Sequence, residues 1–274
     1  MEKTLKKEKL FNRNFIIIVI GICALYIGYQ VTGSVFSTFI NSIGDGAKVT
    51  GTISLAWTIT AVIVRPLAGS LSDSKGTKIV AVIGGILFAA GLFAMTFVTS
   101  GYGILLLRVV QACGHACIIT ASLTSAQKSV PKSRAGEGAF YFNGIPQTAS
   151  QFVGGNLGVA LVGVAGVSYT FGNSDYFLVF TVSAVLVIIA LLCNLLIKTD
   201  EDTKNAVEEV SEIKSEEIVG TGIAKVIEVS AIVPALIYLF GAIGFQGFQS
   251  YVALYATTFS LAGLGLFFTA NGIA

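Results

Sequence analysis

A ten-residue polar stretch, Gly69-Ser-Leu-Ser-Asp-Ser-Lys-Gly-Thr-Lys78, joins two apolar blocks at about residues 51–71 and 79–99. Each block has the roughly 20 residues that an α-helix needs to cross the hydrocarbon core of a membrane. The stretch itself contains two glycines, one aspartate and two lysines. Because glycine permits the backbone conformations that tight turns require, the pattern predicts a short charged connection between two membrane helices.

Apolar blocks of similar length recur along most of the chain. They run at about 15–39, 103–126, 136–163 and 176–197, and, after a polar segment, at about 231–256 and from Leu261 onward. Hydrophobic residues make up 54% of the 274 residues and charged residues 12%, against ~25% charged residues in a soluble protein. This composition predicts an all-α polytopic membrane protein and argues against a soluble enzyme or a nucleic-acid-binding protein.

The lysines and arginines are distributed unevenly between the two sides of the predicted helices. Fourteen of the 17 fall on one side, whereas only Lys48 falls on the other. Basic residues are enriched in the cytoplasmic loops of membrane proteins. We therefore expect a cytoplasmic N-terminus at residues 1–14 and a cytoplasmic linker at residues 198–230. The linker carries nine acidic residues and four lysines, which suits a solvated segment.

The ten-residue stretch resembles the signature of the major facilitator superfamily, which lies between the second and third helices of that fold. The family pattern is Gly-x-Leu-x-Asp-x-x-Gly followed by basic residues, and the matching positions here are Gly69, Leu71, Asp73, Gly76 and Lys78. The preceding pair, Arg65-Pro66, is typical of the drug-exporter-like branch. The resemblance implies that the five matching residues, together with Arg65, form a cytoplasmic gate.

Two further stretches are similar to patterns of the same family. Arg108-Val-Val-Gln-Ala-Cys-Gly114 resembles Arg-x-x-Gln-Gly-x-Gly, with alanine in place of one glycine. The stretch from Ser133 to Gly138 is similar to the basic, glycine-containing entry to the fifth helix.

The family resemblance also implies an architecture of twelve helices in two six-helix halves. Residues 15–197 would form the six-helix N-terminal bundle, and residues 231–274 the first one or two helices of the second bundle. We therefore expect a truncated sequence, whose partner is a missing C-terminal half or a second subunit.

Arg108 is the main candidate for a substrate-binding or proton-path residue. A charge at the centre of a bilayer costs about 2.5 kcal/mol or more, so the side chain needs partners or a water-filled cavity. Helical spacing places Gln111, His115 and Ser122 on the same face. His115 is the only histidine, and its ordinary pKa would let it carry a coupling proton. Alternatively, the arginine bridges backbone carbonyls between helices and the histidine packs in a hydrogen-bonded core.

Polar residues at helical spacing form further stripes in other apolar blocks. They lie in the first, fifth and seventh blocks, and the candidate path residues among them are Tyr26, Gln30, Asn143, Gln147, Gln151, Gln246 and Gln249. Such residues either line a solute path or hold neighbouring helices together.

We expect a secondary active transporter of small organic solutes in the plasma membrane, of the efflux type and working by alternating access. A sugar or organic-anion symporter or uniporter remains an alternative, as does a non-transporting fragment or regulatory subunit. The four cysteines lie inside apolar blocks, and the sequence offers neither a nucleophile–base pair nor a metal cluster. We therefore expect no enzyme activity, metal, cofactor or nucleic acid. The expected partners are a small-molecule substrate, the lipid bilayer and a coupling proton.

Overall fold

The computed structural model describes residues 10–43, 46–98, 100–163, 176–197 and 264–273, with isolated residues and pairs between 233 and 256. These described residues are almost entirely helical and include no strand. The predicted linker at 198–230 lies outside them, as does most of the predicted seventh block. Two compact units divide the chain: Met1–Ile197 with Ala253–Ala274, and Lys198–Val252. The helices described below belong to the first unit.

Five segments of the described chain are long and apolar enough to cross a membrane. They comprise α1 (Arg13–Gly33) with α2 (Phe36–Ser42), α3 (Gly46–Lys75), α4 (Thr77–Ala94) with its final turn, α5 (Gly101–Ser129) and α8 (Phe177–Leu196). A sixth segment is helical throughout, but its hydrogen-bonding pattern changes from α to π and back to α. It consists of α6 (Ala135–Ala149), the π-helical turn η3 (Ser150–Gly155) and α7 (Asn156–Gly163). The predicted six-helix all-α bundle is confirmed.

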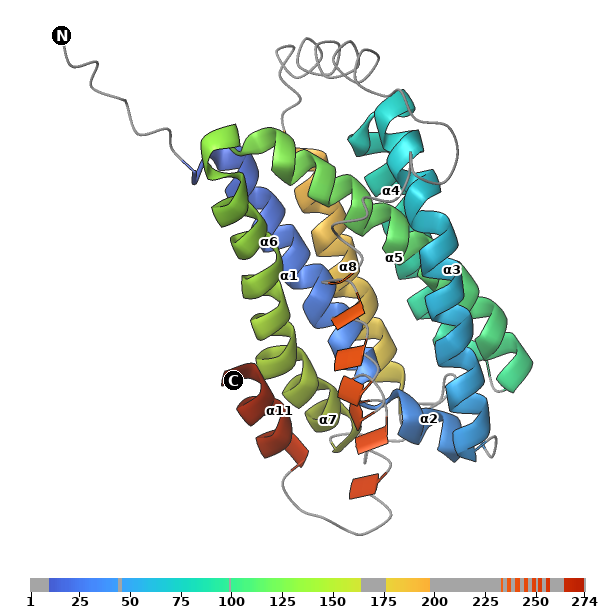
Figure 1. The fold of residues 1–274 in the computed structure, drawn as a ribbon. Coiled ribbons are helices and arrows are strands. Elements are labelled where there is room, and N and C mark those ends of the chain that lie inside the picture. Colours follow the sequence, from blue (N-terminus) through green and yellow to red (C-terminus); the bar gives the residue numbers. More distant parts are fainter. Residues whose placement is uncertain are drawn as a thin grey trace, which may run out of the picture. The chain divides into compact units, whose positions relative to one another are not determined.

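The bundle is built from pairs of closely packed helices, with α4 against α5 and α1 against α8 (Figure 1). Large buried side chains such as Phe15, Leu25 and Phe88 fill the space between them. At the α4–α5 crossing, a Cβ on Gly84 would lie 2.7 Å from the carbonyl oxygen of Gly114. Small residues of this kind let membrane helices approach until their backbones touch.

The ten-residue stretch that joins α3 to α4 is more helical than the predicted loop. Residues 69–75 belong to the last turns of α3, and α4 begins at Thr77. Gly76 alone leaves the helix, with φ of +89°. Side-chain-bearing residues rarely adopt this conformation, so the glycine is needed for the turn. The predicted tight connection is confirmed, but it is one residue long because the preceding polar residues suit an exposed helix end.

The π-helical turn η3 interrupts the sixth segment at the point where the helix α11 (Leu264–Ile273) packs against it. Pro146 lies in the last turn of α6, and η3 follows at Ser150. Proline cannot donate a backbone hydrogen bond, and π-helical turns interrupt the regular ladder. The helix α11 packs against η3, α6 and α7. A Cβ on Gly155 would meet the ring of Phe268 at 2.5 Å, so glycine is required for this close approach.

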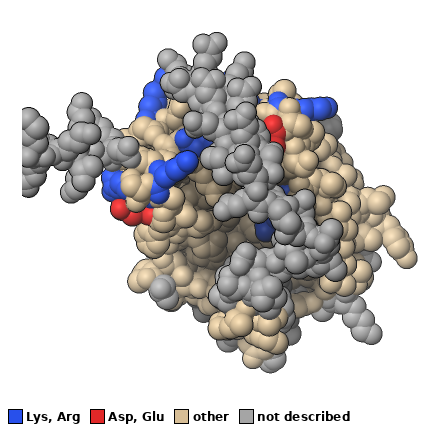
Figure 2. Space-filling view, turned by 45° about the horizontal axis from the view of Figure 1, so that its top comes forward, with Lys and Arg blue, Asp and Glu red and all other residues tan. Residues whose placement is uncertain are grey.

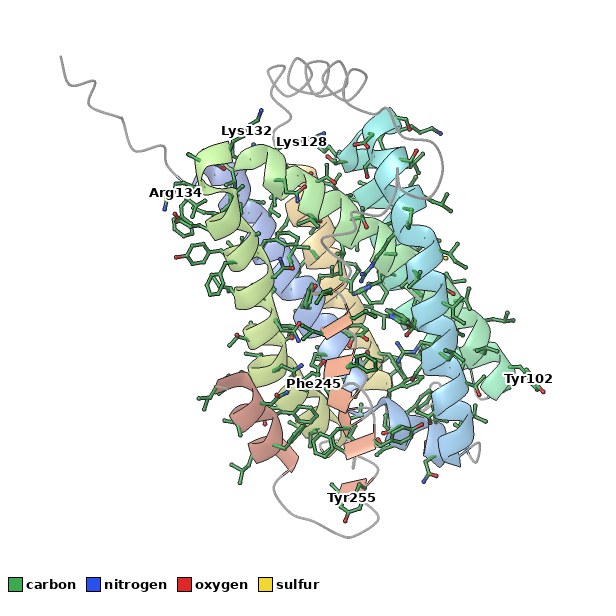
Figure 3. The ribbon with its side chains drawn as sticks, in the orientation of Figure 1. Tyr102, Lys128, Lys132, Arg134, Phe245 and Tyr255 are labelled. Carbon is green, nitrogen blue, oxygen red and sulfur yellow. The ribbon has the colours of Figure 1, made fainter. Side chains whose placement is uncertain are left out.

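Basic side chains gather at one end of the bundle. Figure 3 shows Lys128, Lys132 and Arg134 at this end, whereas Tyr102 lies at the opposite end of α5. The Lys and Arg side chains in Figure 2 likewise concentrate where the top of the molecule comes forward. Arg134 pairs with Glu137 at 2.5 Å, and this hydrogen bond raises the pKa of the guanidinium.

Candidate functional site

Arg108 lies inside the bundle, against aromatic rings from two other helices. The side chain is only 6% exposed. Its Cζ atom lies 3.7 Å from the ring centroid of Phe36 on α2 and 5.3 Å from that of Trp57 on α3. The negative face of an aromatic ring attracts a cation, by about 2 kcal/mol when both groups are desolvated. These rings therefore offset part of the cost of holding the charge in an apolar environment.

Gln111 orients Arg108 from the next turn of α5. Its Oε1 accepts a hydrogen bond from Nη1 of Arg108 at 3.3 Å, and its Nε2 donates to the carbonyl oxygen of Gly91 at 2.8 Å. A Cβ on Gly91 would lie 2.7 Å from Cγ of Gln111, so α4 leaves room for the amide only because glycine is there. The predicted pairing of the arginine and glutamine on one helix face thus has a structural basis.

His115 lies one turn further along α5, within a group of aromatic side chains. Its ring centroid is 5.0 Å from that of Tyr29, and 5.3 Å from those of Trp57 and Phe88. The side chain is 8% exposed, and its Nδ1 atom has no hydrogen-bond partner among the described residues. Buried polar atoms are usually paired, so an unpaired nitrogen marks a position where a ligand or water is expected.

Sequence reasoning missed the aromatic part of this site. Tyr29, Phe36, Trp57 and Phe88 come from four different helices and surround the predicted polar face of α5. Apolar side chains at helical spacing in a membrane protein normally indicate packing or lipid contact. One sequence feature could have pointed to the aromatic residues: the single tryptophan, Trp57, lies in the span that precedes the signature stretch. We call Arg108, Gln111, His115 and these four aromatic residues the α5 site.

Gln30, Gln151 and Asn143, which belong to the other predicted stripes, form hydrogen bonds with residues outside the α5 site. Gln30 donates to Oε1 of Gln151 at 3.3 Å, and the same oxygen accepts from Asn271 on α11 at 3.1 Å. Asn143 is exposed and donates to the carbonyl oxygen of Ala139 in its own helix. Gln147 is also exposed and Tyr26 is half-buried. Gln30 and Gln151 thus link helices in this structure.

Two other predicted groups lie elsewhere. Ser122, on the predicted polar face of α5, donates to Asn194 of α8 at 3.0 Å and so joins two helices away from Arg108. Gln246 is outside the described residues, and Gln249 belongs to the separately described unit. The predicted gate residues lie in α3, in α4 or between them: Arg65, Asp73, Gly76 and Lys78 are exposed, and Gly69 and Leu71 are half-buried.

Sequence comparison assigns the chain to a family. A family model described as the Major Facilitator Superfamily matches residues 18–274, which is most of the chain. The chain belongs to the major facilitator superfamily. The superfamily expectation is thereby confirmed, and the chain is a multi-pass membrane protein from a family of transporters.

Two solved structures of this superfamily fold resemble the chain. The inward-open xylose transporter XylE from E. coli superposes with a TM-score of 0.60 at 14% identity, over 86% of this chain and 63% of that one. The nucleoside transporter NupG gives 0.57 at 13% identity, over 85% and 54%. The chain thus spans less than two thirds of either structure, and identities this low show the fold alone. No curated protein matches the sequence significantly.

Replacing Gln151 by leucine should weaken the contact between η3 and α11. The substitution leaves the donors of Gln30 and Asn271 without their shared acceptor, at an expected cost of about 1–2 kcal/mol in a membrane. We expect a lower melting temperature in detergent. Asn143→Leu is the matched control, because that amide bonds only within its own helix. Equal melting temperatures for both variants and the parent would contradict a structural role for Gln151.

Proposed function

We propose that this superfamily member is a secondary active transporter of small organic solutes, of the efflux type, in the plasma membrane. The α5 site would bind the solute, and the helical halves would expose it to each side of the membrane in turn. The drug-exporter-like pair Arg65-Pro66 supports the efflux direction.

The buried charge of Arg108 is the observation that supports this proposal most strongly. An arginine in a membrane helix is expensive and is rarely found without a functional partner. Here Arg108 lies against the rings of Phe36 and Trp57, and Trp57 also packs against His115, whose Nδ1 has no hydrogen-bond partner among the described residues. If the site only packed helices together, apolar side chains of similar size would serve without the free-energy cost of desolvating a charge.

Each residue of the α5 site then has a defined task. Arg108 holds a polar group of the solute, and Gln111 fixes the orientation of the guanidinium. Nδ1 of His115 is free to bond the solute or to exchange a coupling proton. Once the solute is bound, the aromatic rings would shield these groups from water, which strengthens their electrostatic interactions. At the cytoplasmic end, Asp73 and its neighbours would act as the gate.

Solute flux in everted membrane vesicles tests the proposal. The protein is expressed from its complete reading frame, and a panel of labelled organic solutes is offered with and without a proton gradient. We expect saturable, gradient-dependent accumulation of at least one solute. Accumulation equal to that of vesicles without the protein, for every solute, would refute the transport function.

The proposed orientation makes a separate prediction. The 14 basic residues on one side should be cytoplasmic, so the end that carries Lys132 faces the cytoplasm and Lys48 faces outward. In a background without native cysteines, an impermeant thiol reagent added to intact cells should label Lys48→Cys and spare Lys132→Cys. Labelling at position 132 but not at 48 would show that the orientation is inverted.

A further inference from the structure

We infer that the solute of the α5 site is an organic anion, with a carboxylate or similar group on a largely apolar body. This inference rests on the proposed transport function and adds the charge and polarity of the solute. It comes from three features of the site: its charge balance, the donors left on the guanidinium, and the chemistry of the surrounding side chains.

The α5 site carries a positive charge that the described chain does not neutralise. Asp73 and Glu137 are the two acidic residues among the described positions, and both are exposed. Within this part of the chain, the one ion pair joins Arg134 to Glu137. Arg108 therefore has an amide oxygen and two aromatic rings as neighbours, but no described carboxylate. An anion entering this site would supply the counter-charge.

The guanidinium of Arg108 retains donors that match a planar anion. The group carries five N–H donors, of which the described structure engages one, through Nη1 and Gln111. The centroid of the Phe36 ring lies 3.7 Å from Cζ, and an aromatic ring is not a conventional hydrogen-bond acceptor, so the other N–H donors remain available. A carboxylate can accept two parallel hydrogen bonds from one edge of a guanidinium, which a neutral carbonyl cannot match in strength.

The surrounding side chains favour an apolar body over a sugar. Beyond Arg108, the polar groups of the α5 site are few: the amide of Gln111, the ring nitrogens of His115, the hydroxyl of Tyr29 and the indole N–H of Trp57. The amide is already bonded on both its atoms, to Arg108 and to Gly91. A polyhydroxyl solute would lose most of its hydrogen bonds to water there without replacement. Aromatic rings such as Tyr29 and Trp57 instead offer contact area to apolar or ring-containing groups.

The single tryptophan provides a direct test by ligand binding. Trp57 contacts both Arg108 and His115, so its fluorescence reports on the α5 site alone. The purified protein in detergent, which adds no tryptophan, is titrated with benzoate, benzamide and benzylamine, which share a ring and are anionic, neutral and cationic at neutral pH. We expect saturable quenching by benzoate with an affinity at least tenfold above benzamide, and no saturable change with benzylamine.

Variants separate the site from general charge effects. Arg108→Ala should lose saturable benzoate quenching, and Arg108→Lys should keep the preference for the anion with about tenfold weaker binding, because the planar fork is gone. Lys128→Ala removes a positive charge at the exposed end of α5 and should bind benzoate like the parent protein. A melting curve for each variant verifies that it is folded.

Three outcomes would overturn the anion inference: equal affinity for the three probes, a preference for benzylamine, or no saturable effect of benzoate on the parent protein. The ligand series on the parent protein keeps this test valid if Arg108→Ala does not fold. Flux measurements distinguish failure of the anion inference from failure of the proposed transport function. Transport of neutral or cationic solutes without binding of benzoate contradicts the inference alone, whereas absence of all flux contradicts the proposed function.

Discussion

Arg108→Ala should reduce transport at least ~30-fold while the protein remains folded and inserted. Removing a charged partner that binds its ligand typically costs about 2–5 kcal/mol of interaction. The folded state loses the ring contacts with Phe36 and Trp57, but it also no longer has to desolvate a buried charge. We therefore expect the melting temperature in detergent to stay within a few degrees of the parent protein.

Flux and melting temperature must be measured on the same preparations of the Arg108 variants. If the arginine only held helices together, Arg108→Ala would lower stability, expression and transport in parallel. Normal transport by Arg108→Ala would remove the basis of the proposed site. Arg108→Lys keeps the charge and should transport at an intermediate rate, because a lysine cannot offer the same planar set of donors.

Gly114→Ala should destabilise the bundle although it adds a single methyl group. The new Cβ would lie 2.5 Å from the backbone nitrogen of Phe88 and 2.6 Å from the carbonyl oxygen of Gly84. Both are backbone atoms of α4, so the two helices would have to separate. Overpacking of this kind costs about 1–3 kcal/mol, and it would also shift Gln111 away from Gly91.

Gly136→Ala is the matched control for this substitution. A Cβ at Gly136 in α6 would meet nothing within 4 Å, so only the helix propensity changes. Alanine is favoured over glycine in a helix by about 0.5–1 kcal/mol, and this variant should melt at the same or a higher temperature. If thermal unfolding in detergent showed Gly114→Ala as stable as Gly136→Ala, the close α4–α5 packing described here would be wrong.

Much of the fold could be predicted because membrane helices leave a strong pattern in the sequence. Apolar blocks of about 20 residues indicated the approximate positions of the spans between residues 13 and 197. The glycine in the connecting stretch indicated a tight turn, and the structure places Gly76 at positive φ there. Arg108 and Gln111 could be paired because residues three apart share a helix face. The superfamily followed from motifs in their expected order, and the family match confirms it.

The details of the site could not be predicted, since helical spacing identifies a face but not its neighbours. Ser122 shares a face with Arg108 in the linear pattern, yet it bonds to Asn194 on α8. The aromatic rings around His115 come from three other helices, and helical spacing alone does not distinguish them from lipid-facing residues. The π-helical turn shifts the register after Ala149, so the four-residue spacing of the fifth block does not place Gln151 with Asn143.

Cysteine accessibility at position 115 tests the central claim most directly, because a solute path is reached by water and a packed core is not. In a cysteine-free background, His115→Cys is treated with an impermeant thiol reagent from each side of the membrane, and Ile118→Cys, fully buried one turn away, is the control. Our account predicts labelling of position 115 from both sides as the halves alternate, protection by transported solute, and no labelling at 118. Position 115 as unreactive as position 118 from both sides would contradict it.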